Sequence, residues 1–420
     1  MSLTQRIVSA MVLGLLIGGS MNLLFAGEIL SQGLETWITK YLIDGLFDTV
    51  GQIFVNSLKL MVVPLVFVSL LCGMASLGGG SRMGLLAGKT LCLYLVTTAV
   101  AISLALSFAL ILGPGNDINL AEASEFAASE APPFKTTLIN IFPSNPVAAM
   151  AEGQVLQVIV FALLIGLASS KSGDAGRRLL DFFDDLNKVI METVMLLMVL
   201  APYGIFCLLV KLFASLGFGV IVSLASYFFT VLLALAAHGV GTYSLLLLWT
   251  GLSPWRFFVK MRGPMAFAFS TSSSGATMPV TLKTVNEDLG VDNRVASFTV
   301  PLGATINMDG TAIMQGVATV FIAQAYNINL GIEAYLTVIL TATLASIGTA
   351  AVPGVGLVML VMVLNQVGLP VEGIGLIIGV DRMLDMCRTA VNVAGDGTIS
   401  TFVAHSEGFH DREKFNATNL

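Results

Sequence analysis

The sequence has 420 residues, of which 56% are hydrophobic and only 11% are charged, and its formal net charge is −6. A soluble domain carries about 25% charged residues, so this composition excludes an ordinary soluble domain and predicts an integral membrane protein. The acidic balance, without a basic patch, argues against a nucleic-acid-binding protein. The cysteines stand singly in apolar segments, as is typical of buried thiols rather than of a metal site or disulfides: Cys72, Cys92, Cys207 and Cys387.

Hydropathy predicts eight membrane-spanning helices. The apolar run after Arg6 reaches Ala26, close to the ~20 residues that cross a bilayer and longer than a signal-peptide core, so we expect a first spanning helix there. The second stretch, 43–77, is longer than a perpendicular helix needs, and we expect it to tilt, to extend past the bilayer or to bend at Pro64. The eight predicted spans are 5–26, 43–77, 84–113, 146–170, 186–213, 217–251, 296–327 and 372–404.

The loop at 114–147 differs from the spans because it is acidic, polar and interrupted by Pro132 and Pro133, so we expect it to be exposed. Basic residues gather at alternate ends of the spans, and such residues favour the cytoplasmic side. We therefore expect both termini to be cytoplasmic, the loop 114–147 to be extracellular, and the protein to lie in the inner (cytoplasmic) cell membrane. The basic residues in question are Arg6, Arg82, Lys89, Lys171, Arg177, Arg178, Arg256, Lys260, Arg262, Arg412 and Lys414.

Two further segments, 258–292 and 333–366, have apolar arms around a polar centre, at 270–279 and 346–354. Each arm is too short to cross about 30 Å of hydrocarbon at a helical rise of about 1.5 Å per residue. Taken alone, each centre could be an ordinary loop. Because a polar-interrupted span follows each segment, we predict two re-entrant helical hairpins in a repeated hairpin–helix order, which in transporters points to a midplane binding site.

The span between the hairpins contains Asn307-Met-Asp-Gly-Thr311. We expect Gly310 to break the helix and to free backbone carbonyls. Carbonyl, amide, hydroxyl and carboxylate oxygens suit a hard cation such as sodium, whereas no thiolate or imidazole cluster suits a transition metal. The alternative is a structural kink that the asparagine stabilises.

The last span carries a stripe of polar residues. At about 100° per residue, its members fall within an arc of roughly 100°. Charge at bilayer depth costs several kcal/mol per group, so such a stripe usually marks an ion or substrate path; the alternative is a structural row of ion pairs. Arg382, at the edge of the stripe, is expected to pair locally or to face a protein neighbour. The stripe comprises Asp381, Asp385, Arg388, Thr389, Asn392 and Asp396.

Four motifs in span order resemble the dicarboxylate/amino acid:cation symporter family, which contains the sodium-coupled glutamate transporters, and the chain looks most like a bacterial member. They are the serine-rich centre at 270–279, the Asn307–Thr311 motif, 348–354 and 385–392. The resemblance covers most of the chain. It implies an all-α polytopic membrane protein, with eight transmembrane helices, two re-entrant hairpins and inverted repeats, which works as an elevator-type transporter.

The resemblance also implies a homotrimer of independent protomers and a division of each chain. The hairpin at 333–366 would act as the extracellular gate. The divisions would be scaffold helices 1 and 2 in 1–77, transport-domain helix 3 in 78–113, an extracellular loop in 114–147, scaffold helices 4 and 5 with the trimer contact in 148–215, helix 6 of the transport domain in 216–257, the transport core in 258–404 and a cytoplasmic tail in 405–420.

Carried over by motif, Arg388 would bind the side-chain carboxylate of an acidic amino acid, because a guanidinium matches a carboxylate bidentately. Asp385 would take the α-ammonium group, and Asp381 would contact Arg388. The α-carboxylate would be held by Asn392, Thr389, Ser273 and Ser274, with Thr311 and Val352 lining the site.

The co-transported ion implied is Na⁺, with no organic cofactor, and three groups of residues would bind it. The first combines Asn392 and Asp396 with carbonyls near Gly303 and Asn307. The second combines Thr305 with hairpin backbone at Ser346, Ile347 and Thr349. The third combines Asp309 and Asn307 with Tyr94, Thr97 and Thr98 of the third span.

Two positions depart from the family pattern. Archaeal relatives carry an arginine just before the serine triplet, and vertebrate relatives carry it directly after the aspartate that matches Asp385. This chain has Thr271 or Ser272 and Met386 at those places, so that auxiliary positive charge is missing. Alignment from Pro279 also puts Gly275 at the last serine of the triplet.

We predict a secondary symporter that imports acidic amino acids, aspartate or glutamate, with sodium. A neutral amino acid carrier would typically lack the arginine at 388, since an unpaired buried guanidinium is costly. In a proton- or sodium-coupled C4-dicarboxylate symporter, Asp385 would repel the second carboxylate. An ion channel would show rings of selectivity residues, and no H-E-x-x-H or G-x-S-x-G motif suggests an enzyme.

Overall fold

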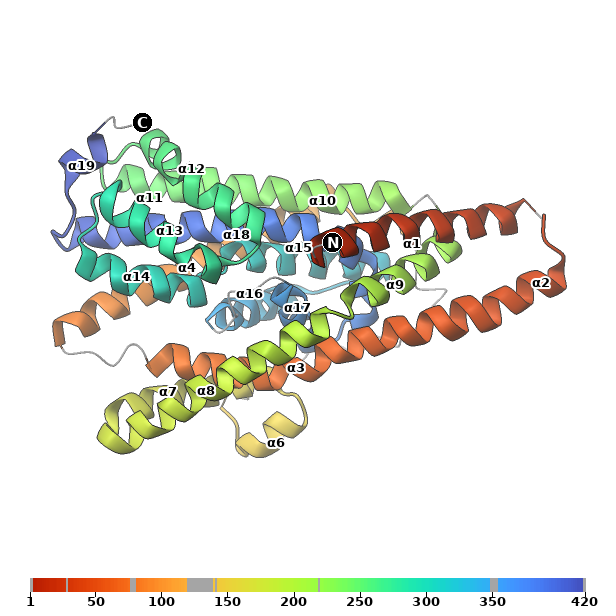
Figure 1. Ribbon diagram of the computed structural model, residues 1–420, viewed down its shortest axis with the longest axis horizontal. Coiled ribbons are helices and arrows are strands. Elements are labelled where there is room, and N and C mark those ends of the chain that lie inside the picture. Colours follow the sequence, from red (N-terminus) through yellow and green to blue (C-terminus); the bar gives the residue numbers. More distant parts are fainter. Residues whose placement is uncertain are drawn as a thin grey trace.

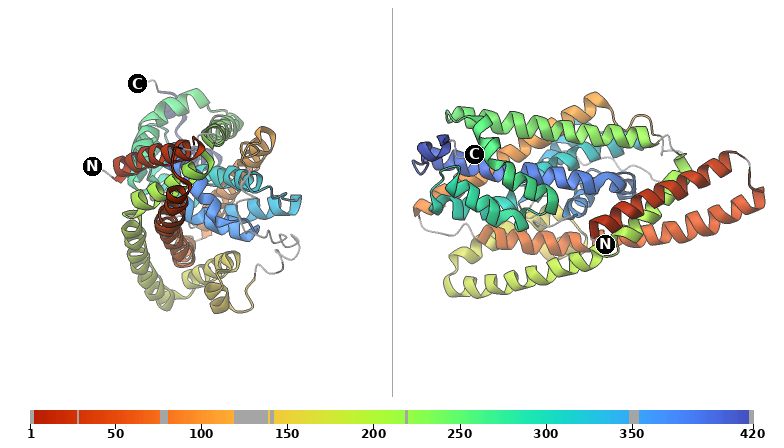
Figure 2. Two further views of the ribbon diagram at one scale, coloured as in Figure 1. Left: turned by 90° about the vertical axis from the view of Figure 1, so that its right-hand side faces the viewer. Right: turned by 45° about the horizontal axis from the view of Figure 1, so that its top comes forward.

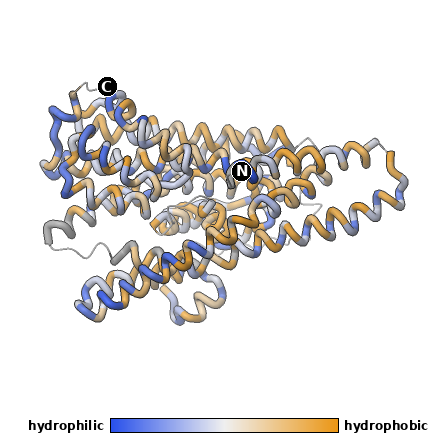
Figure 3. The backbone as a smooth tube through the Cα atoms, in the orientation of Figure 1, coloured by the Kyte–Doolittle hydropathy of each residue, from blue (hydrophilic) through white to orange (hydrophobic). Residues whose placement is uncertain are grey.

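The computed structural model describes residues 3–27, 29–75, 81–118, 139, 142–217, 220–347 and 354–417. Within these ranges the chain is predominantly helical, and the only bridge of β type joins Val291 to His410. The helices form an elongated bundle (Figure 1). Apolar residues run along the helices, and many of the hydrophilic ones gather at the end where the C-terminus lies (Figure 3).

Four helices are long and apolar enough to cross a membrane: Gln5–Ala26, Gln32–Cys72, Gly88–Leu112 and Ile221–Trp249. A fifth candidate is the pair Gly173–Leu197 and Ala201–Ser215, which is bent by 46°. These counts rest on length and composition within the described residues, so the predicted number of eight spans stays a prediction.

The first helices follow the prediction with one difference. The second span begins at Gln32, well before the predicted residue 43, and it continues through Pro64 to Ala75. Its early part is π-helical, which hydropathy does not reveal. The helices are α1 (Leu3–Ala26), α2 (Gln32–Trp37), the π-helix η1 (Ile38–Phe47), α3 (Asp48–Ala75) and α4 (Ser81–Leu112).

The next predicted spans, 146–170 and 186–213, are divided differently. The first is interrupted after α6 at Gly153, whose φ is +67°. The second starts already at Gly173 and bends near Leu200, where Pro202 in the first turn of α9 cannot extend the preceding hydrogen-bond ladder. The helices are α6 (Pro146–Ala151), α7 (Val155–Lys171), α8 (Gly173–Met198) and α9 (Ala201–Leu216).

The second half contains two helix pairs where hairpins are predicted. We call α12 with α13 hairpin 1, and α16 with α17 hairpin 2. Hairpin 1 reverses at Ser272, whose backbone is left-handed with φ 53°. The helices are α10 (Val220–Ala236), the π-helix η4 (Ala237–Thr242), α11 (Tyr243–Trp249), α12 (Pro254–Thr271), α13 (Ser274–Glu287), α14 (Asn293–Ile306), α15 (Asp309–Ala325), α16 (Ile332–Ser346), α17 (Val355–Gln366), the short 3₁₀ turn η5 (Val371–Gly373), α18 (Ile374–Ser406) and α19 (Arg412–Asn416).

Helix α18 lies inside the bundle, and α15 is buried along almost its whole length (Figure 2). Helix α18 packs mainly on α9, α10, α12, α14 and α15, and it also contacts α4, α11, α13 and α17, while α15 packs on α4 as well. Most of these helices are separated widely in the sequence. The polar stripe of α18 therefore faces protein rather than the outer surface of the bundle.

The described part of the C-terminal segment packs on the base of hairpin 1. Phe415 is fully buried, and Lys260 donates to the carbonyl oxygens of Asp288 and Lys414, both at 2.8 Å. Arg412 donates to the carbonyl oxygen of Thr250 at 2.9 Å. Residues 405–417 thus cover the ends of hairpin 1 rather than hanging free of the bundle.

Candidate functional site

The seventh predicted span is broken where the site lies. Helix α14 ends at Ile306 and α15 begins at Asp309, with extended or intermediate backbone at Asn307 and Met308. The expectation that Gly310 breaks the helix is wrong, because Gly310 lies in the first turn of α15. Gly310 instead allows α15 to approach α18 closely, because a Cβ at this position would lie 2.5 Å from the carbonyl oxygen of Arg388.

Helix α18 buries the whole predicted stripe, with relative exposures between 0% and 7%. Arg388 is completely buried and donates from Nη1 to Asp381 Oδ1 at 2.8 Å and from Nη2 to Asp385 Oδ1 at 3.0 Å. Its Nε is buried without a hydrogen-bond partner. The guanidinium is therefore balanced by two carboxylates and keeps one donor for another acceptor.

The second oxygen of Asp385 faces hairpin 2. Gly354, just before α17, donates its backbone N–H to Asp385 Oδ2 at 3.1 Å. Arg382 Nη1 lies 3.5 Å from the same oxygen, which is the local pairing expected for this arginine. Asp385 thus links α18 to the beginning of α17, and neither of its oxygens is unengaged.

The other predicted substrate residues surround this ion-pair cluster to different extents. Thr389 donates to the carbonyl oxygen of Asp385 at 2.7 Å. A Cβ on Gly356 would contact both Thr311 and Arg388, so Thr311 lies beside the guanidinium. Ser273 accepts a hydrogen bond from Ala276 N as the N-cap of α13, Ser274 is buried, and α13 packs on α18. Val352 lies outside the described residues.

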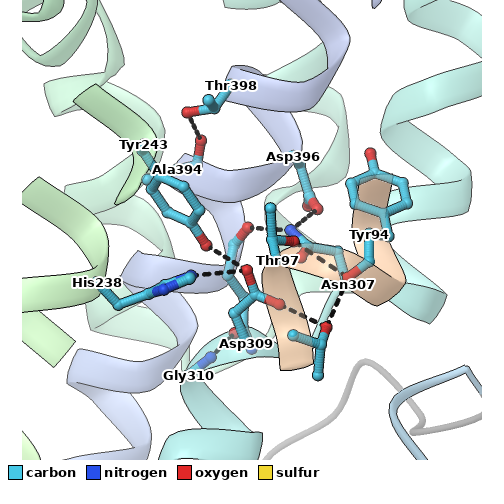
Figure 4. A network of polar contacts seen from close by, with 12 residues as sticks. Tyr94, Thr97, His238, Tyr243, Asn307, Asp309, Gly310, Ala394, Asp396 and Thr398 are labelled. Atoms are coloured by element: carbon cyan, nitrogen blue, oxygen red, sulfur yellow. Dashed lines mark hydrogen bonds and ion pairs between the residues drawn. The ribbon is translucent and has the colours of Figure 1, made fainter. Parts of the chain in front are cut away.

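A second polar cluster centres on Asp309, which is fully buried (Figure 4). Thr98 donates to its Oδ1 at 2.6 Å. Its Oδ2 accepts from Tyr243 Oη and contacts His238 Nε2, both at 2.9 Å. Of the predicted partners, Thr98 reaches the carboxylate directly, while Tyr94 and Thr97 lie in the adjacent turn of α4 (Figure 4).

His238 and Tyr243 were not predicted as site residues. They stand at positions i and i+5 around the π-helical turn η4, and in a π-helix such residues lie one turn apart. Their rings meet edge to face with centroids 4.7 Å apart. The sequence offered one signal for His238, which is that a single histidine lies in an apolar run. It offered none for Tyr243, because α-helical periodicity would place this tyrosine on a different face of the helix from His238.

Asn307, at the helix break, is hydrogen-bonded to α18. Its Nδ2 donates to Asp396 Oδ1 at 2.9 Å and to the carbonyl oxygen of Asn392 at 3.1 Å, while its Oδ1 is buried without a partner. Asn392 Oδ1 in turn accepts from Gly310 N at 2.7 Å. The structure therefore brings Asn307, Asn392 and Asp396 of the predicted first cation group together.

Gly303 permits this convergence. A Cβ at this position would overlap Asp396 Oδ1 and lie 2.6 Å from Tyr94 Oη. Tyr94 is fully buried and donates to the carbonyl oxygen of Thr299 at 3.0 Å. Buried carboxylate, amide and phenolic oxygens at a helix break form a donor set that suits a hard monovalent cation.

The second predicted cation group is not brought together by the contacts of the described residues. Thr305 is exposed and donates to the carbonyl oxygen of Leu302 at 2.9 Å. Ser346 and Ile347 are buried at the end of α16, and Ser346 donates to Thr343 O at 2.8 Å. Thr349 lies outside the described residues, so this group stays a prediction.

Comparison with known proteins gives one family. Residues 3–406 match the profile of the sodium:dicarboxylate symporter family. The proton/sodium-glutamate symport protein of Bacillus subtilis (strain 168) is 32% identical, over 93% of each chain. The proton/glutamate-aspartate symporter of Escherichia coli (strain K12) is 32% identical over 98% of this chain and 94% of its own. The neutral amino acid transporter A of Homo sapiens is 32% identical over 96% of this chain and 82% of its own.

Proposed function

This chain belongs to the sodium:dicarboxylate symporter family, and we propose that it is a secondary symporter that imports acidic amino acids, aspartate or glutamate, together with sodium ions. Members of this family are membrane transporters rather than enzymes, so we assign the buried polar residues to transport. The proposal concerns the substrate, the ion and the way the chain carries them.

The observation that carries the proposal is Arg388. It is completely buried, lies between two carboxylates and has one unused donor. A guanidinium in this position binds a carboxylate strongly and with defined geometry. A neutral amino acid whose ammonium group takes Asp385 would bring no side-chain carboxylate in exchange, and Arg388 would be left with Asp381 alone. Breaking a buried ion pair without replacing the lost partner is destabilising.

Asp385 supplies the opposite charge. Its two oxygens already accept from Arg388 and from Gly354 N, both of which can be replaced by the α-ammonium group of the substrate. Arg388 then turns to the side-chain carboxylate. The ion pair between Asp385 and Arg388 is thereby exchanged for two ion pairs with the substrate, one between Asp385 and the ammonium group and one between Arg388 and the side-chain carboxylate.

Sodium is proposed because the Asp309 and Asn307 clusters offer oxygen ligands. Asn307 Oδ1 is buried without a hydrogen-bond partner. The carboxylate of Asp396 accepts a hydrogen bond from Asn307, and the carboxylate of Asp309 accepts one from Thr98. Asn392 contacts the Asn307–Gly310 segment through both its carbonyl and its side chain. Because Asn392 is also a proposed substrate ligand, it couples the ion to the substrate.

The remaining architecture is proposed from the family resemblance. We propose eight spanning helices with hairpins 1 and 2 re-entrant, a homotrimer, and an elevator movement of α4 and residues 216–404 against a scaffold that contains α1, α3, α7 and α9. The termini would be cytoplasmic in the inner cell membrane. We also propose the second cation group, which combines Thr305 with Ser346, Ile347 and Thr349.

The test is uptake into liposomes that contain the purified protein. Labelled L-aspartate, L-glutamate, succinate and L-serine are supplied with a sodium gradient or a proton gradient imposed separately. We expect sodium-driven accumulation of the first two. Accumulation of L-serine in preference to L-aspartate, or uptake driven by the proton gradient alone, would contradict the proposal; equilibration without accumulation would indicate a channel.

A further inference from the structure

Asp385 is flanked by two guanidinium groups in the structure. Arg388 Nη2 donates to Oδ1 at 3.0 Å, and Arg382 Nη1 lies 3.5 Å from Oδ2. Both arginines stand three residues from Asp385 on α18, one on each side in the sequence. Side chains at this spacing lie on one face of a helix, so the carboxylate sits between the two cations.

The two arginines differ in burial and in closeness. The side chain of Arg388 is 0% exposed and that of Arg382 is 15% exposed. The Arg382 contact is also longer than the 2.8 Å contact between Arg388 and Asp381. Arg382 therefore holds the weaker of the ion pairs and is partly exposed, whereas Arg388 is fully buried within the bundle.

Together with Asp381, these side chains form an alternating row of two negative and two positive groups, which is neutral without any ligand. In a poorly solvated site, removing one member of such a row leaves an uncompensated charge. Arg382 neutralises Asp385 on the side that faces Gly354 at the start of α17. This is the side on which the proposed function places the α-ammonium group.

We infer that Arg382 is a specificity-determining residue that occupies, with its guanidinium, the place beside Asp385 which the ammonium group of an amino acid takes on binding. The inference rests on the proposed function. An amino acid displaces Arg382 with its own positive charge. A dicarboxylate without an amino group leaves Arg382 paired with Asp385. The negative charge of Asp385 is then neutralised, and it repels the second carboxylate of the ligand less strongly than an unpaired Asp385 would.

Arg382 also bears on a departure from the family resemblance. The auxiliary arginine that the resemblance leads us to expect is absent here, where Thr271 or Ser272 and Met386 stand. Arg382 brings a positive charge next to the same aspartate from another position of α18. It acts through Asp385, and its effect is therefore on the choice between ligands with and without an amino group.

The test compares ligand binding in three variants. Displacement of labelled L-aspartate by unlabelled L-aspartate and by succinate is measured on the purified protein in sodium, for wild type, Arg382→Met and Arg382→Lys. Arg294→Met is the matched control, because the Arg294 side chain is 73% exposed and pairs with Asp292. The ratio of the succinate constant to the aspartate constant is the readout, and it requires no transport.

We expect Arg382→Met to raise this ratio about tenfold, which corresponds to about 1.4 kcal/mol, and Arg382→Lys to raise it less. Arg294→Met should leave it unchanged. A ratio within twofold of wild type in Arg382→Met would overturn the inference. If that variant does not fold, Arg382→Gln takes its place, with folding checked by thermal melting. Wild-type protein that binds neither ligand would instead contradict the proposed function.

Discussion

The guanidinium of Arg388 donates to the carboxylate of Asp385 at 3.0 Å, so the two side chains to which we assign the opposite charges of an acidic amino acid are bound to each other. When the substrate binds, its charged groups therefore replace Arg388 and Asp385 as each other's ion-pair partners. The exchange also releases Gly354, which donates to Asp385 at 3.1 Å. The substrate and the start of α17 therefore compete for one carboxylate.

The first prediction concerns the cation cluster around Asp309. Tyr243→Phe removes one hydrogen bond to Oδ2 and keeps the ring against His238. We expect the sodium concentration for half-maximal uptake to rise at least about tenfold, since a hydrogen bond to a charged group contributes about 1.5–3 kcal/mol and about 1.4 kcal/mol corresponds to a factor of ten. A sodium titration of uptake measures it.

The matched control for this change is Tyr227→Phe. Tyr227 is also fully buried, but its hydroxyl has no hydrogen-bond partner, so its removal should leave the sodium dependence as in wild type. Equal sodium titrations for Tyr243→Phe and wild type would remove Tyr243 from the cation site. Asp309→Asn should weaken the sodium dependence further than Tyr243→Phe does.

The second prediction concerns Gly303. In Gly303→Ala the added methyl group overlaps Asp396 Oδ1 and Tyr94 Oη, so the oxygens around Asn307 must move apart. We expect sodium-dependent uptake to fall at least about tenfold, because ligand positions in a cation site tolerate little displacement. Gly88→Ala is the control, since nothing lies within 4 Å of a Cβ at Gly88 in α4. Wild-type uptake by Gly303→Ala would show that this convergence is not needed.

The third prediction concerns the base of hairpin 1. Phe415 is fully buried against it, and truncating a buried phenylalanine to alanine costs about 3–5 kcal/mol in a well-packed core. Phe415→Ala should therefore speed amide hydrogen exchange at the ends of hairpin 1, near Thr250–Ser253 and Asp288–Asp292. Glu413→Ala changes an exposed neighbour in the same helix and should leave the exchange unaltered. Unchanged protection in Phe415→Ala would mean that the C-terminal segment does not hold the hairpin.

The fourth prediction concerns pH. Burial lowers the pKa of His410 below its usual 6.5, and the positive charge of Arg412 and the neighbouring His405 act in the same direction, against the opposing effects of the Leu289 carbonyl and Asp411. The folded segment thus prefers neutral His410. Its contribution to stability is complete above pH 6.5 and is lost as the pH falls from 6.5 through the lowered folded-state pKa.

This predicts that amide exchange at the base of hairpin 1, corrected for the intrinsic rate, is faster at pH 5.5 than at pH 7.5. His410→Gln retains a donor toward the carbonyl oxygen of Leu289, now 3.0 Å from the ring nitrogen, and should remove most of the pH dependence. A pH dependence that is the same in wild type and His410→Gln would rule out this histidine as its source.

The polar stripe of α18 and both helix pairs could be predicted from sequence because each depends on a local pattern. Helical periodicity places Asp381 to Asp396 on one face, and short apolar arms around polar centres predict hairpins. The break in the seventh span was predicted within the Asn307–Thr311 motif and lies there, but the residue held responsible was the wrong one. Gly310 looked like the breaker, but the residues that leave the helix are Asn307 and Met308, whose side chains bind α18.

Other features depend on contacts that no local pattern contains. The first half of α8 carries many charged residues, so the hydropathy pattern does not reveal that the helix begins before the predicted fifth span. His238 and Tyr243 meet only because η4 is π-helical, which changes the face on which the tyrosine lies. The packing of Phe415 on hairpin 1 joins segments that are far apart in the sequence, and no local pattern in residues 405–417 predicts it.

The central claim is that Arg388 and Asp385 together select an acidic amino acid. The most direct measurement is sodium-gradient-driven uptake of labelled L-aspartate and L-serine by wild type and Arg388→Cys in parallel liposomes. We predict that wild type accumulates L-aspartate, and that Arg388→Cys loses this uptake at least about a hundredfold while L-serine uptake is retained or gained. Unchanged accumulation of L-aspartate by Arg388→Cys would contradict the account.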